Sequence, residues 1–407
     1  MKCGLLGEKL GHSYSPQIHG LLGDYSYALF EKELSELESF LNSGDFTGLN
    51  VTIPYKKAVI PYCSKLSDRA SQLGAVNTIV RQADGALIGH NTDYFGFLSM
   101  LRKSKLEVSG KKVLVLGSGG ASATAVAVLE ESNADVVVIS RAGANNYGNL
   151  YLHTDAAVIV NTTPVGMYPN VGISPVDLSL FPYLEGVLDV VYNPAHTQLL
   201  MDAESKGLTA VNGLWMLVAQ AKESAEWFTG HPISDEVILH IYRKLRCQME
   251  NIVLVGMPGC GKTTIGKMLA ERAGKTFVDA DAVIAEQAGM SIPEIFRQSG
   301  ESGFRSWETK ILSQLGKRSG LVIATGGGCV THKENYPLLH QNGTIIWLQR
   351  ELSMLPTDGR PLSQAGKLQD MYEVRKPLYE RFADCTIDNN GDPANTVREI
   401  LLLEDRS

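Results

Sequence analysis

The chain has 407 residues, of which 44% are hydrophobic and 20% charged, and its formal net charge is −7. This length predicts more than one domain, since domains of about 100–200 residues are usual. The acidic balance argues against a nucleic-acid or membrane-surface partner, which needs basic patches. No run approaches the ~18 apolar residues of a membrane span, and the first residues lack a sustained apolar stretch, so we expect a cytoplasmic protein.

Six cysteines are scattered along the chain without a C-x-x-C pair. This pattern predicts reduced thiols in a cytosolic protein and argues against a disulfide scaffold. Cys260 lies inside a glycine-rich loop, where we expect it to be exposed enough for oxidation.

The first hundred residues alternate short β-rich runs with helical patterns. We expect strands at Cys3–Gly7 and Tyr27–Glu31 and helices at Ser15–Leu22 and Leu34–Asn42. The alternation predicts an α/β domain.

The alternation becomes clearer between residues 110 and 230. Helical patterns cover Ser122–Glu131 and Leu214–Phe228. The predicted strands are Lys112–Leu116, Asp135–Ser140, Ala157–Asn161 and Gly186–Val191. Strands separated by helices in this way are typical of an open parallel sheet.

A second cycle begins at Ile252. We expect its later strands at Phe277–Asp279, Leu321–Thr325, Ile345–Leu348 and Thr386–Asp388. Before this cycle, Asp235–Lys244 is predicted to be a helix and Leu245–Glu250 a short joint. Without a Gly/Ser-rich or Pro-rich linker, the two halves are expected to lie close together.

The run Gly117-Ser-Gly-Gly-Ala-Ser122 follows the first clear buried strand. Glycines in a strand-to-helix turn let the backbone approach a pyrophosphate, which predicts a dinucleotide-binding site. The next strand ends in Ser140-Arg141 and not in the Asp or Glu that would bind an NAD ribose. Arginine suits a 2′-phosphate through charge-assisted hydrogen bonds, so we expect NADP(H).

A second glycine-rich turn, Gly256 to Thr263, matches G-x-x-x-x-G-K-[ST] directly after an apolar run. Such a loop directs backbone N–H groups at the phosphates of a nucleoside triphosphate. Lys262 is expected to reach the β- and γ-phosphates, and Thr263 to ligate Mg²⁺. One chain therefore carries the motifs of two different nucleotide-dependent enzymes.

Upstream of the first turn lie polar clusters that a hydrophobic core does not need. They are Gly11-His-Ser-Tyr-Ser-Pro16, Asn50-Val-Thr-Ile-Pro-Tyr-Lys56, Gly74-Ala-Val-Asn-Thr78 and Gly89-His-Asn-Thr-Asp93. With Asn161-Thr-Thr-Pro-Val-Gly-Met167, Tyr192 and Asn212-Gly213, this series resembles the shikimate dehydrogenases over about residues 1–245. Gly20 and Ser140-Arg141-Ala142 depart from that family's usual Asn and Asn-Arg-Thr.

The resemblance implies a substrate site and a cofactor site. Ser13, Ser15 and Tyr192 would hold the substrate carboxylate, and Thr52, Asn77 and Gln220 would bind ring hydroxyls. Lys56 and Asp93 would be the acid/base pair, with Asp93 also touching the substrate. The residues implied for NADP binding are Asp68, Gly117, Ser118, Gly119, Gly120, Ala121, Ser140, Arg141, Val190 and Gly213.

The chemistry of ketone reduction agrees with the proposed acid/base pair. A hydride that reaches a ketone carbon leaves an alkoxide, which needs a positioned proton donor, and Lys56 is the natural donor in this set. The alternative for Lys56 is a surface lysine at a strand end. Asp93 also suits the N-cap of a helix over Tyr94–Leu101. His12 and His19 are expected to be structural, because no metal-ligand spacing surrounds them.

The second half carries five further segments with polar or glycine residues: the first and third end predicted strands, the second follows a Gly300-Glu301 turn, the fourth lies in a loop and the fifth on a predicted helix. These are Asp279-Ala-Asp281, Phe304-Arg305, Ala324-Thr-Gly-Gly-Gly-Cys-Val330, Arg360-Pro-Leu362 and Arg375 with Tyr379. Three consecutive glycines are costly unless something approaches the backbone closely. With the phosphate loop, this set resembles the shikimate kinases over about residues 250–407.

That second resemblance implies that Asp281 orients the attacking hydroxyl and that Arg305 and Arg375 clamp the carboxylate. Gly327 would touch the substrate ring, Arg360 would close over the transferred phosphate, and Asp279 would support Mg²⁺ through water. The residues implied for ATP binding are Gly259, Cys260, Gly261, Lys262, Thr263, Thr264 and Arg360.

We therefore expect three α/β domains: a substrate-binding domain over 1–100 with return helices at 211–245, a Rossmann-like NADP domain over 101–210, and a P-loop kinase domain over 250–407. The resemblances together imply reduction of 3-dehydroshikimate followed by phosphorylation of shikimate, two steps of aromatic amino-acid synthesis, with small-molecule partners only. The alternatives are a pair acting on quinate or gluconate-like acids and a regulatory protein with dead sites. Ser15 and the glycine triplet favour the first reading over quinate, and intact Lys56 and Lys262 disfavour dead sites.

Overall fold

The computed structural model describes residues 1–11, 13–355 and 365–406. The chain forms two compact units. The first unit consists of Met1–Val165, Ser174–Tyr192 and Asp202–Tyr242, and the second of Gly166–Ile173, Asn193–Met201 and Arg243–Ser407. Among the helices of the described ranges, none has both the length and the apolar character needed to cross a membrane.

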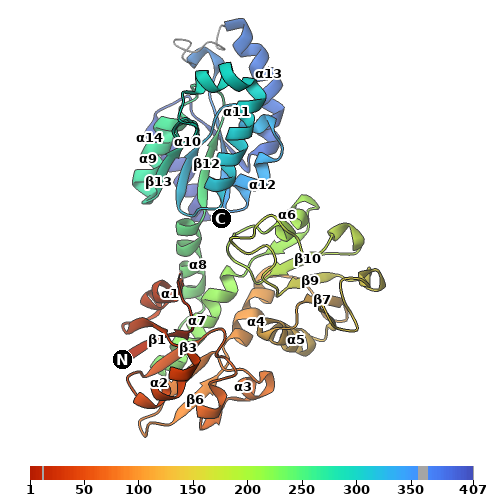
Figure 1. Ribbon diagram of the computed structural model, residues 1–407, viewed down its shortest axis with the longest axis vertical. Coiled ribbons are helices and arrows are strands. Elements are labelled where there is room, and N and C mark those ends of the chain that lie inside the picture. Colours follow the sequence, from red (N-terminus) through yellow and green to blue (C-terminus); the bar gives the residue numbers. More distant parts are fainter. Residues whose placement is uncertain (12, 356–364, 407) are drawn as a thin grey trace. The chain divides into compact units, whose positions relative to one another are not determined.

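The first unit begins with a six-stranded sheet in the order β2-β1-β3-β5-β6-β4 (Figure 1). Its strands are β1 (Lys2–Gly7), β2 (Ser26–Glu31), β3 (Gly48–Val51), β4 (Lys65–Leu66), β5 (Thr78–Arg81) and β6 (Leu87–His90). The helices between them are α1 (Ser15–Leu22), α2 (Leu37–Ser43) and α3 (Asp68–Leu73), with 3-10 turns at Leu34–Glu36 and Ile60–Tyr62.

Strand direction in this sheet brings separate segments to one edge. β1 and β3 run parallel, so both end at that edge. β5 is antiparallel to β3 and to β6, so β5 begins and β6 ends there, with Thr78 beside both Asn50 and His90. The residues that follow β1, β3 and β6 and precede β5 therefore meet, although they lie far apart in the sequence.

The second sheet of this unit has five parallel strands in the order β11-β10-β9-β7-β8. They are β7 (Lys112–Leu116), β8 (Asp135–Ile139), β9 (Val158–Asn161), β10 (Gly186–Asp189) and β11 (Thr209–Val211). The α-helices of this region are α4 (Asp93–Ser104), α5 (Gly120–Glu131), α6 (Gln198–Ser205) and α7 (Leu214–Thr229), with 3-10 turns at Leu150–His153 and Leu178–Leu180. All four residues from Val113 to Leu116 are completely buried, as expected for a strand covered on both faces.

The second unit is built on a five-stranded parallel sheet in the order β13-β14-β12-β15-β16, with helices on both faces (Figure 1). The strands are β12 (Asn251–Val255), β13 (Thr276–Asp279), β14 (Leu321–Ala324), β15 (Gly343–Gln349) and β16 (Cys385–Asp388). The helices are α9 (Lys262–Ala273), α10 (Ala280–Ala288), α11 (Ile292–Gly316), α12 (Asn335–His340), α13 (Ala365–Phe382) and α14 (Pro393–Arg406), with 3-10 turns at Cys329–Thr331 and Leu352–Met354. The expected α/β class, with parallel nucleotide-binding sheets, is confirmed.

The joint predicted at Leu245–Glu250 is wrong, because helix α8 runs without interruption from Glu236 to Met249. Ile238, Ile241, Leu245 and Met249 are all buried, at the three- and four-residue spacing of one helix face. The apolar stripe therefore continues through the supposed joint, and no Gly or Pro interrupts it.

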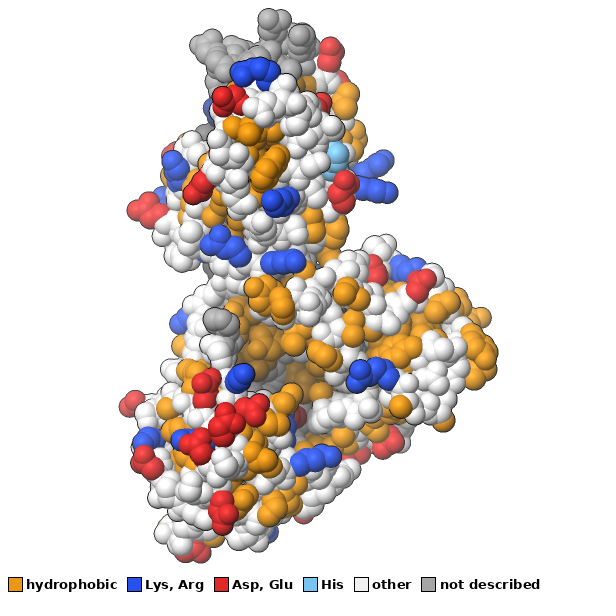
Figure 2. Space-filling view, viewed as in Figure 1, with side chains coloured by type: hydrophobic (Ala, Val, Ile, Leu, Met, Phe, Trp, Pro, Cys, Tyr) orange, Lys and Arg blue, Asp and Glu red, His pale blue; other side chains and the backbone are white. Residues whose placement is uncertain are grey.

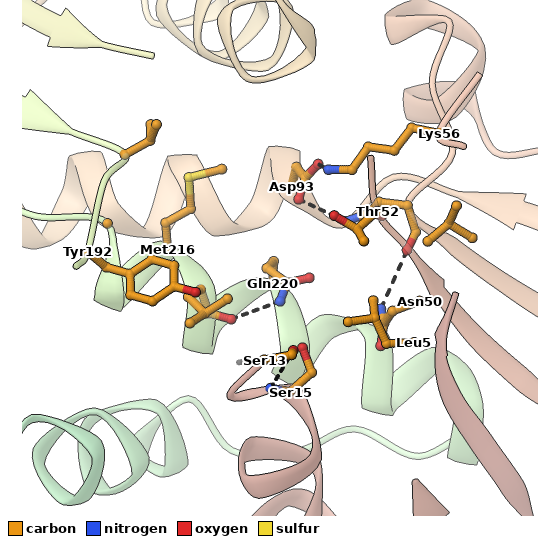
Figure 3. Close-up of a pocket in the computed structure, with 15 residues that line it drawn as sticks. Leu5, Ser13, Ser15, Asn50, Thr52, Lys56, Asp93, Tyr192, Met216 and Gln220 are labelled. Carbon is orange, nitrogen blue, oxygen red and sulfur yellow. Dashed lines mark hydrogen bonds and ion pairs between the residues drawn. The ribbon is translucent and has the colours of Figure 1, made fainter. Parts of the chain in front are cut away.

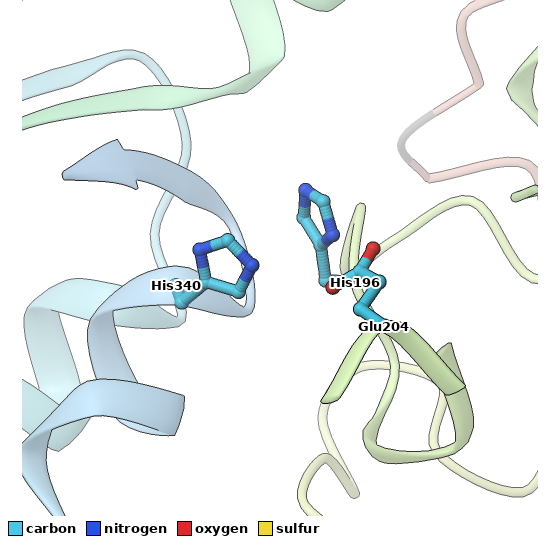
Figure 4. Close-up of side chains that lie close together, drawn as sticks. All are labelled: His196, Glu204 and His340. Carbon is cyan, nitrogen blue, oxygen red and sulfur yellow. The ribbon is translucent and has the colours of Figure 1, made fainter. Parts of the chain in front are cut away.

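The second unit also includes the short segment Asn193–Met201. The His196 backbone N–H donates to the Gln341 carbonyl oxygen at 2.8 Å. The rings of His196 and His340 lie 4.5 Å apart (Figure 4), and Nδ1 of His340 is 3.3 Å from a carboxylate oxygen of Asp384. These contacts bring the segment against α12.

Candidate active sites

A cavity of about 280 Å³ opens in the first unit (Figure 3). Its lining residues are Leu5, Ser13, Ser15, Asn50, Val51, Thr52, Lys56, Asn77, Asp93, Val190, Tyr192, Gly213, Met216, Leu217 and Gln220. The surface of this unit is hollowed between the parts that carry its two sheets, with hydrophobic side chains in the hollow (Figure 2). A cavity of this size, with a few convergent polar groups, suits a small polar molecule.

Lys56 and Asp93 form an ion pair in this cavity, with 2.6 Å between Nζ and Oδ2. Their side chains are 28% and 16% exposed, so both are largely shielded from solvent but can still reach the cavity. Asp93 is the first residue of α4, where the positive end of the helix dipole favours a carboxylate. The N-cap expectation for Asp93 is wrong: Thr92 holds that position.

Asn77 fixes the other oxygen of the Asp93 carboxylate. Its Nδ2 donates to Oδ1 of Asp93 at 2.9 Å, while its own Oδ1 accepts the Thr92 backbone N–H at 2.7 Å. Asn77 precedes β5, and Asp93 follows β6. The antiparallel pairing of these two strands therefore places the amide beside the carboxylate.

Ser13 and Ser15 lie at the start of α1, where the Ser15 backbone N–H donates to Oγ of Ser13 at 3.2 Å. Tyr192 reaches the cavity from the second sheet and packs edge-on against Tyr14, and burial raises the pKa of its phenol. Gln220 enters from α7 and donates to the Leu217 carbonyl oxygen at 2.9 Å. Hydroxyl and amide groups thus face the cavity from both sheet regions.

The glycine turn after β7 has the backbone that a pyrophosphate site requires. Gly117 has φ +111°, and a Cβ there would lie 2.7 Å from Oγ1 of Thr162. Gly119 is the N-cap of α5, with no side-chain cap, and Cβ atoms at Gly119 or Gly120 would meet nothing within 4 Å. Ser122, which stands where the third glycine is usual, donates to the Gly117 carbonyl oxygen at 2.8 Å.

The expected cofactor residues fall into three places. The turn itself consists of Gly117, Ser118, Gly119, Gly120 and Ala121. Ser140 and Arg141 follow β8 and lie beside this turn, because the Gly117 N–H donates to the carbonyl oxygen of Ile139 at the end of β8. Val190 and Gly213 line the cavity, where a Cβ at Gly213 would collide with the Val190 carbonyl. Asp68 begins α3 and does not line the cavity.

The second unit gathers its phosphate-loop residues at the carboxyl end of β12. Gly259 and Gly261 have φ of +84° and +106°, and Lys262 donates to the carbonyl oxygens of Gly256 and Met257 at 2.8 and 3.1 Å. Thr264 follows within the first turn of α9. The expectation of an exposed Cys260 is wrong: its side chain is 1% exposed and turned into the core.

A hydroxyl and a carboxylate stand together at the expected metal position. Oγ1 of Thr263 donates to Oδ2 of Asp279 at 3.2 Å. Oxygen ligands of this kind suit Mg²⁺, which binds through one or two protein groups and keeps its waters. The residues present therefore fit the metal.

The glycine triplet after β14 is enclosed by the other expected site residues. A Cβ at Gly326 would lie 2.9 Å from Asp281, at Gly327 2.8 Å from Pro258, and at Gly328 2.1 Å from Arg305. Nη1 of Arg375 donates to the Gly327 carbonyl oxygen at 3.2 Å. A side chain at any of the three positions would therefore displace a neighbour, because Asp281, the phosphate loop and Arg305 all pack against their backbone. Arg360 lies outside the described residues.

Glu308 is a site residue that the motifs did not reveal. It is completely buried, accepts from Nη1 of Arg305 at 2.7 Å, and its other oxygen would meet a Cβ at Gly326 at 2.7 Å. Burial raises the pKa of both Glu308 and Asp281, and the neighbouring Asp279 raises that of Asp281 further. The i, i+3 spacing from Arg305 on one helix was an available sign of this pair.

Two more residues hold backbone in place within the second unit. The Tyr379 hydroxyl donates to the Gly327 carbonyl oxygen at 2.5 Å, and Asn389 Nδ2 donates to the Cys260 carbonyl oxygen at 2.7 Å. Tyr379 lies four residues after Arg375, at helical spacing. The partner of Asn389 is 129 residues away, so no local pattern could have identified it.

A glycine-rich turn follows a strand in each of two parallel sheets, and each turn lies beside a polar site. These features indicate a chain that contains two nucleotide-dependent enzymes. Residues 5–79 match the family model of the shikimate dehydrogenase substrate binding domain, and residues 258–403 match that of shikimate kinase. The chain belongs to the shikimate dehydrogenase family and also carries a shikimate kinase domain.

Individual relatives agree over the dehydrogenase part. The shikimate dehydrogenase (NADP(+)) of Clostridium perfringens is 36% identical over 267 residues, covering 60% of this chain and 98% of that protein. The crystal structure of shikimate dehydrogenase 1 from Peptoclostridium difficile is 38% identical, with a TM-score of 0.55 over 60% of this chain and 97% of that one. The enzyme from Thermus thermophilus, solved with NADP(H) and shikimate, is 31% identical, with a TM-score of 0.55 over 60% of this chain and 99% of that one.

Proposed function

We propose that this chain reduces 3-dehydroshikimate to shikimate with NADPH and then phosphorylates the 3-hydroxyl of shikimate with MgATP. The product of the first reaction is the substrate of the second, so the chain would carry two consecutive steps toward chorismate and the aromatic amino acids. The proposed domains are those expected from the sequence: 1–100 with 211–245, 101–210 and 250–407.

The Lys56–Asp93 pair carries the proposal for the first reaction. When bound, NADPH supplies the hydride that reduces the ketone carbon. The Lys56 ammonium group donates its proton to the carbonyl oxygen, and the ketone becomes an alcohol. Asp93, at 2.6 Å, holds the ammonium group in place and directs it at the cavity.

The polar groups at the other end of the cavity support a carboxylate-bearing substrate. Ser13 and Ser15 stand at the N-terminus of α1, where hydroxyls and backbone N–H groups can both donate to an anion. The Tyr192 hydroxyl faces the same cavity, and Thr52 and Gln220 offer partners for ring hydroxyls. We assign these residues to substrate binding.

The turn after β7 fits a dinucleotide, because Gly117 has the backbone that only glycine adopts without strain and α5 begins with uncapped N–H groups. Ser140 and Arg141 at the end of β8 support NADPH over NADH. A carboxylate there would repel the 2′-phosphate, whereas the guanidinium group attracts it.

The enclosed glycine triplet carries the proposal for the second reaction. It brings the Asp281 carboxylate, the Arg305 guanidinium group and the phosphate loop against one short stretch of backbone. Asp281 orients the attacking hydroxyl and accepts its hydrogen bond. Arg305 and Arg375 bind the carboxylate, for which the planar guanidinium fork is suited.

Lys262, Thr263 and Asp279 act on the phosphates of ATP. When bound, Mg²⁺ neutralises charge on the β- and γ-phosphates. Thr263 and Asp279 would hold it, directly and through water, and Lys262 would stabilise the charge on the transferring phosphoryl group. The shikimate hydroxyl oxygen bonds to phosphorus as the bond to ADP breaks, and the hydroxyl proton passes to the Asp281 carboxylate.

A coupled assay tests the whole proposal. Purified protein receives 3-dehydroshikimate with NADPH alone, then with MgATP added, and the products are identified by mass. We expect shikimate in the first case and shikimate 3-phosphate in the second, with NADPH used in preference to NADH. NADPH oxidation without a phosphorylated product would disprove the kinase step. Oxidation of quinate in preference to shikimate in the reverse direction would replace the substrate assignment.

A further inference from the structure

Buried polar side chains form a cluster at the wall of the dehydrogenase cavity and behind it, where a hydrophobic core would be expected. Each is at most 5% exposed: Asn50, Asn77, Thr78, Thr92 and Ser224. Asn50 lies in β3, Thr78 in β5 and Ser224 in α7, while Asn77 directly precedes β5 and Thr92 directly precedes α4. The cluster therefore joins the first sheet to the two helices α4 and α7. Buried polar groups without partners are costly, and here every one has several.

Ser224 is the centre of this cluster. Its Oγ lies 2.8 Å from Nδ2 of Asn50, 2.9 Å from Oγ1 of Thr78 and 2.9 Å from Oγ1 of Thr92. It also donates to the Gln220 carbonyl oxygen at 2.9 Å. A hydroxyl has one hydrogen and two lone pairs. With its hydrogen on Gln220, Ser224 must accept from Asn50 and from a threonine hydroxyl, which saturates it.

The orientation of Asn50 is set from its other side. The hydroxyl of the half-buried Tyr27 donates to Oδ1 of Asn50 at 2.8 Å. Tyr27 stacks on His19 with 4.1 Å between ring centroids, so it has little freedom to move. The Asn50 amide nitrogen therefore faces Ser224 and fixes the position of its hydroxyl.

From Ser224 the hydrogen bonds continue to the reacting pair. Thr92 accepts from Nδ2 of Asn77 at 3.0 Å, and the same nitrogen donates to Oδ1 of Asp93 at 2.9 Å. The Thr92 backbone N–H can only donate, and it points at Oδ1 of Asn77, so the orientation of this amide is also determined. Asp93 then holds Lys56.

We propose that Ser224 is a positioning residue of the dehydrogenase, acting through Thr92 and Asn77 to hold the Asp93 carboxylate against Lys56. The proposal rests on the proposed reduction of 3-dehydroshikimate. Ser224 does not line the cavity, so it touches no substrate. Its loss removes no group that lines the cavity but misplaces the proton donor, so kcat should fall much more than KM changes.

Ser224→Ala tests this role. We expect kcat for NADPH oxidation to fall roughly 10- to 100-fold, with KM for 3-dehydroshikimate and for NADPH within about threefold of wild type. Ser104→Ala is the matched control, because Ser104 is also a buried helical serine and donates only to the nearby Leu101 carbonyl oxygen. Its kcat should stay at the wild-type value.

A double-mutant cycle separates positioning from general damage. In an Asp93→Asn background, Ser224→Ala should cause no further loss, because the carboxylate through which it acts is gone. Should Ser224→Ala fail to fold, Thr92→Val keeps the side-chain shape, removes the hydroxyl that joins Ser224 to Asn77, and should give the same fall in kcat.

Three results would overturn the role of Ser224: a kcat within twofold of wild type, a change confined to KM, or an undiminished effect in the Asp93→Asn background. The wild-type rate with 3-dehydroshikimate decides the proposed function separately. The ratio of the kcat of Ser224→Ala to that of the wild type, measured in either reaction direction, decides the role of Ser224.

Discussion

Lys56 is the residue on which the proposed reduction depends most directly. Its ammonium group lies in the cavity and contacts Asp93, whereas its neighbour Lys57 is exposed. Two lysines adjacent in sequence therefore have different environments, because only one of them faces the edge where β3, β5 and β6 meet.

Lys56→Ala should lower NADPH oxidation with 3-dehydroshikimate by about 10²–10⁴-fold, the usual contribution of a positioned proton donor. Kinase turnover on supplied shikimate should remain near wild type, because Lys56 belongs to the other unit. Lys57→Ala is the control and should leave both rates unchanged. A dehydrogenase rate within a few-fold of wild type in Lys56→Ala would remove Lys56 from the mechanism.

His19 gives the first unit a dependence on pH. It is 1% exposed, and burial lowers its pKa to about 3 from an ordinary value near 6.5. Above pH 6.5 the ring is neutral in both the folded and unfolded states, so stability does not change with pH through His19. Below pH 6.5 only the unfolded state binds the proton, so stability falls as pH falls, by roughly 1.4 kcal/mol per pH unit.

Acidification from pH 7 to pH 5 should therefore cost the first unit about 2 kcal/mol through His19. His19→Phe keeps a ring that can stack on Tyr27 and cannot titrate. Between pH 7 and pH 5 the variant should therefore lose about 2 kcal/mol less stability than the wild type. Pulse proteolysis in urea at both pH values, followed on fragments of the first unit, measures the difference. Equal losses in the two proteins would show that His19 is protonated in the folded state.

At the scale of elements, the turn after β14 determines how the proposed substrate site of the second unit is arranged. Gly326, Gly327 and Gly328 each contact a different part of the site, so this short segment sets the spacing between phosphate loop, carboxylate and guanidinium group. Arg305 cannot move aside freely, because Glu308 holds it inside the protein.

Gly328→Ala should raise KM for shikimate more than tenfold and leave KM for ATP nearly unchanged. The new Cβ would lie 2.1 Å from Nη2 of Arg305, so the guanidinium group must leave its place, and the bidentate contact to a carboxylate is lost. Steady-state kinetics with each substrate varied measures both constants, and the dehydrogenase rate of the same protein controls for its concentration. A matching rise in KM for ATP would instead indicate general distortion of the site.

Helix α8 supplies a second prediction at this scale. Lys244 is exposed in the middle of the helix. Lys244→Pro should cost about 3 kcal/mol or more, because proline removes a helix hydrogen bond and clashes with the preceding turn. Lys244→Ala should cost nothing measurable, since alanine favours the helix. Thermal denaturation followed by circular dichroism compares the two, and equal stabilities would show that this part of the helix contributes little to the fold.

At the scale of the whole molecule, the residues of two proposed active sites lie on one chain. Shikimate is a small, freely diffusing anion, and it escapes from a site far faster than a typical turnover of about 10 s⁻¹. The two reactions should therefore communicate through the bulk solution, and each unit should work without the chemistry of the other.

A mixture of Lys56→Ala and Lys262→Ala proteins should convert 3-dehydroshikimate to shikimate 3-phosphate with NADPH and MgATP, whereas neither variant alone should do so. In the wild type, isotope-labelled shikimate added to the solution should enter the product in proportion to its share of the pool. Exclusion of the label would show that shikimate passes between the sites without release.

The sequence by itself determined the features that depend on local spacing. Apolar runs predicted strands such as Lys112–Leu116 and, with the helical patterns between them, the α/β class. The two turns followed from glycines, which adopt backbone conformations that strain other residues. These signals are local and require no knowledge of distant residues. Local spacing also misled in three places: the joint within α8, the N-cap at Asp93 and the exposure of Cys260 all depend on what packs around them.

Only the tertiary structure decided which distant residues meet. Ser224 contacts Asn50 across 174 positions, and Asn389 contacts the phosphate loop across 129. A serine in an amphipathic helix and an asparagine after a strand have no local pattern that distinguishes them from surface residues. Their roles arise because parallel and antiparallel pairing brings strand ends to one edge, where buried polar groups must satisfy one another in the absence of water.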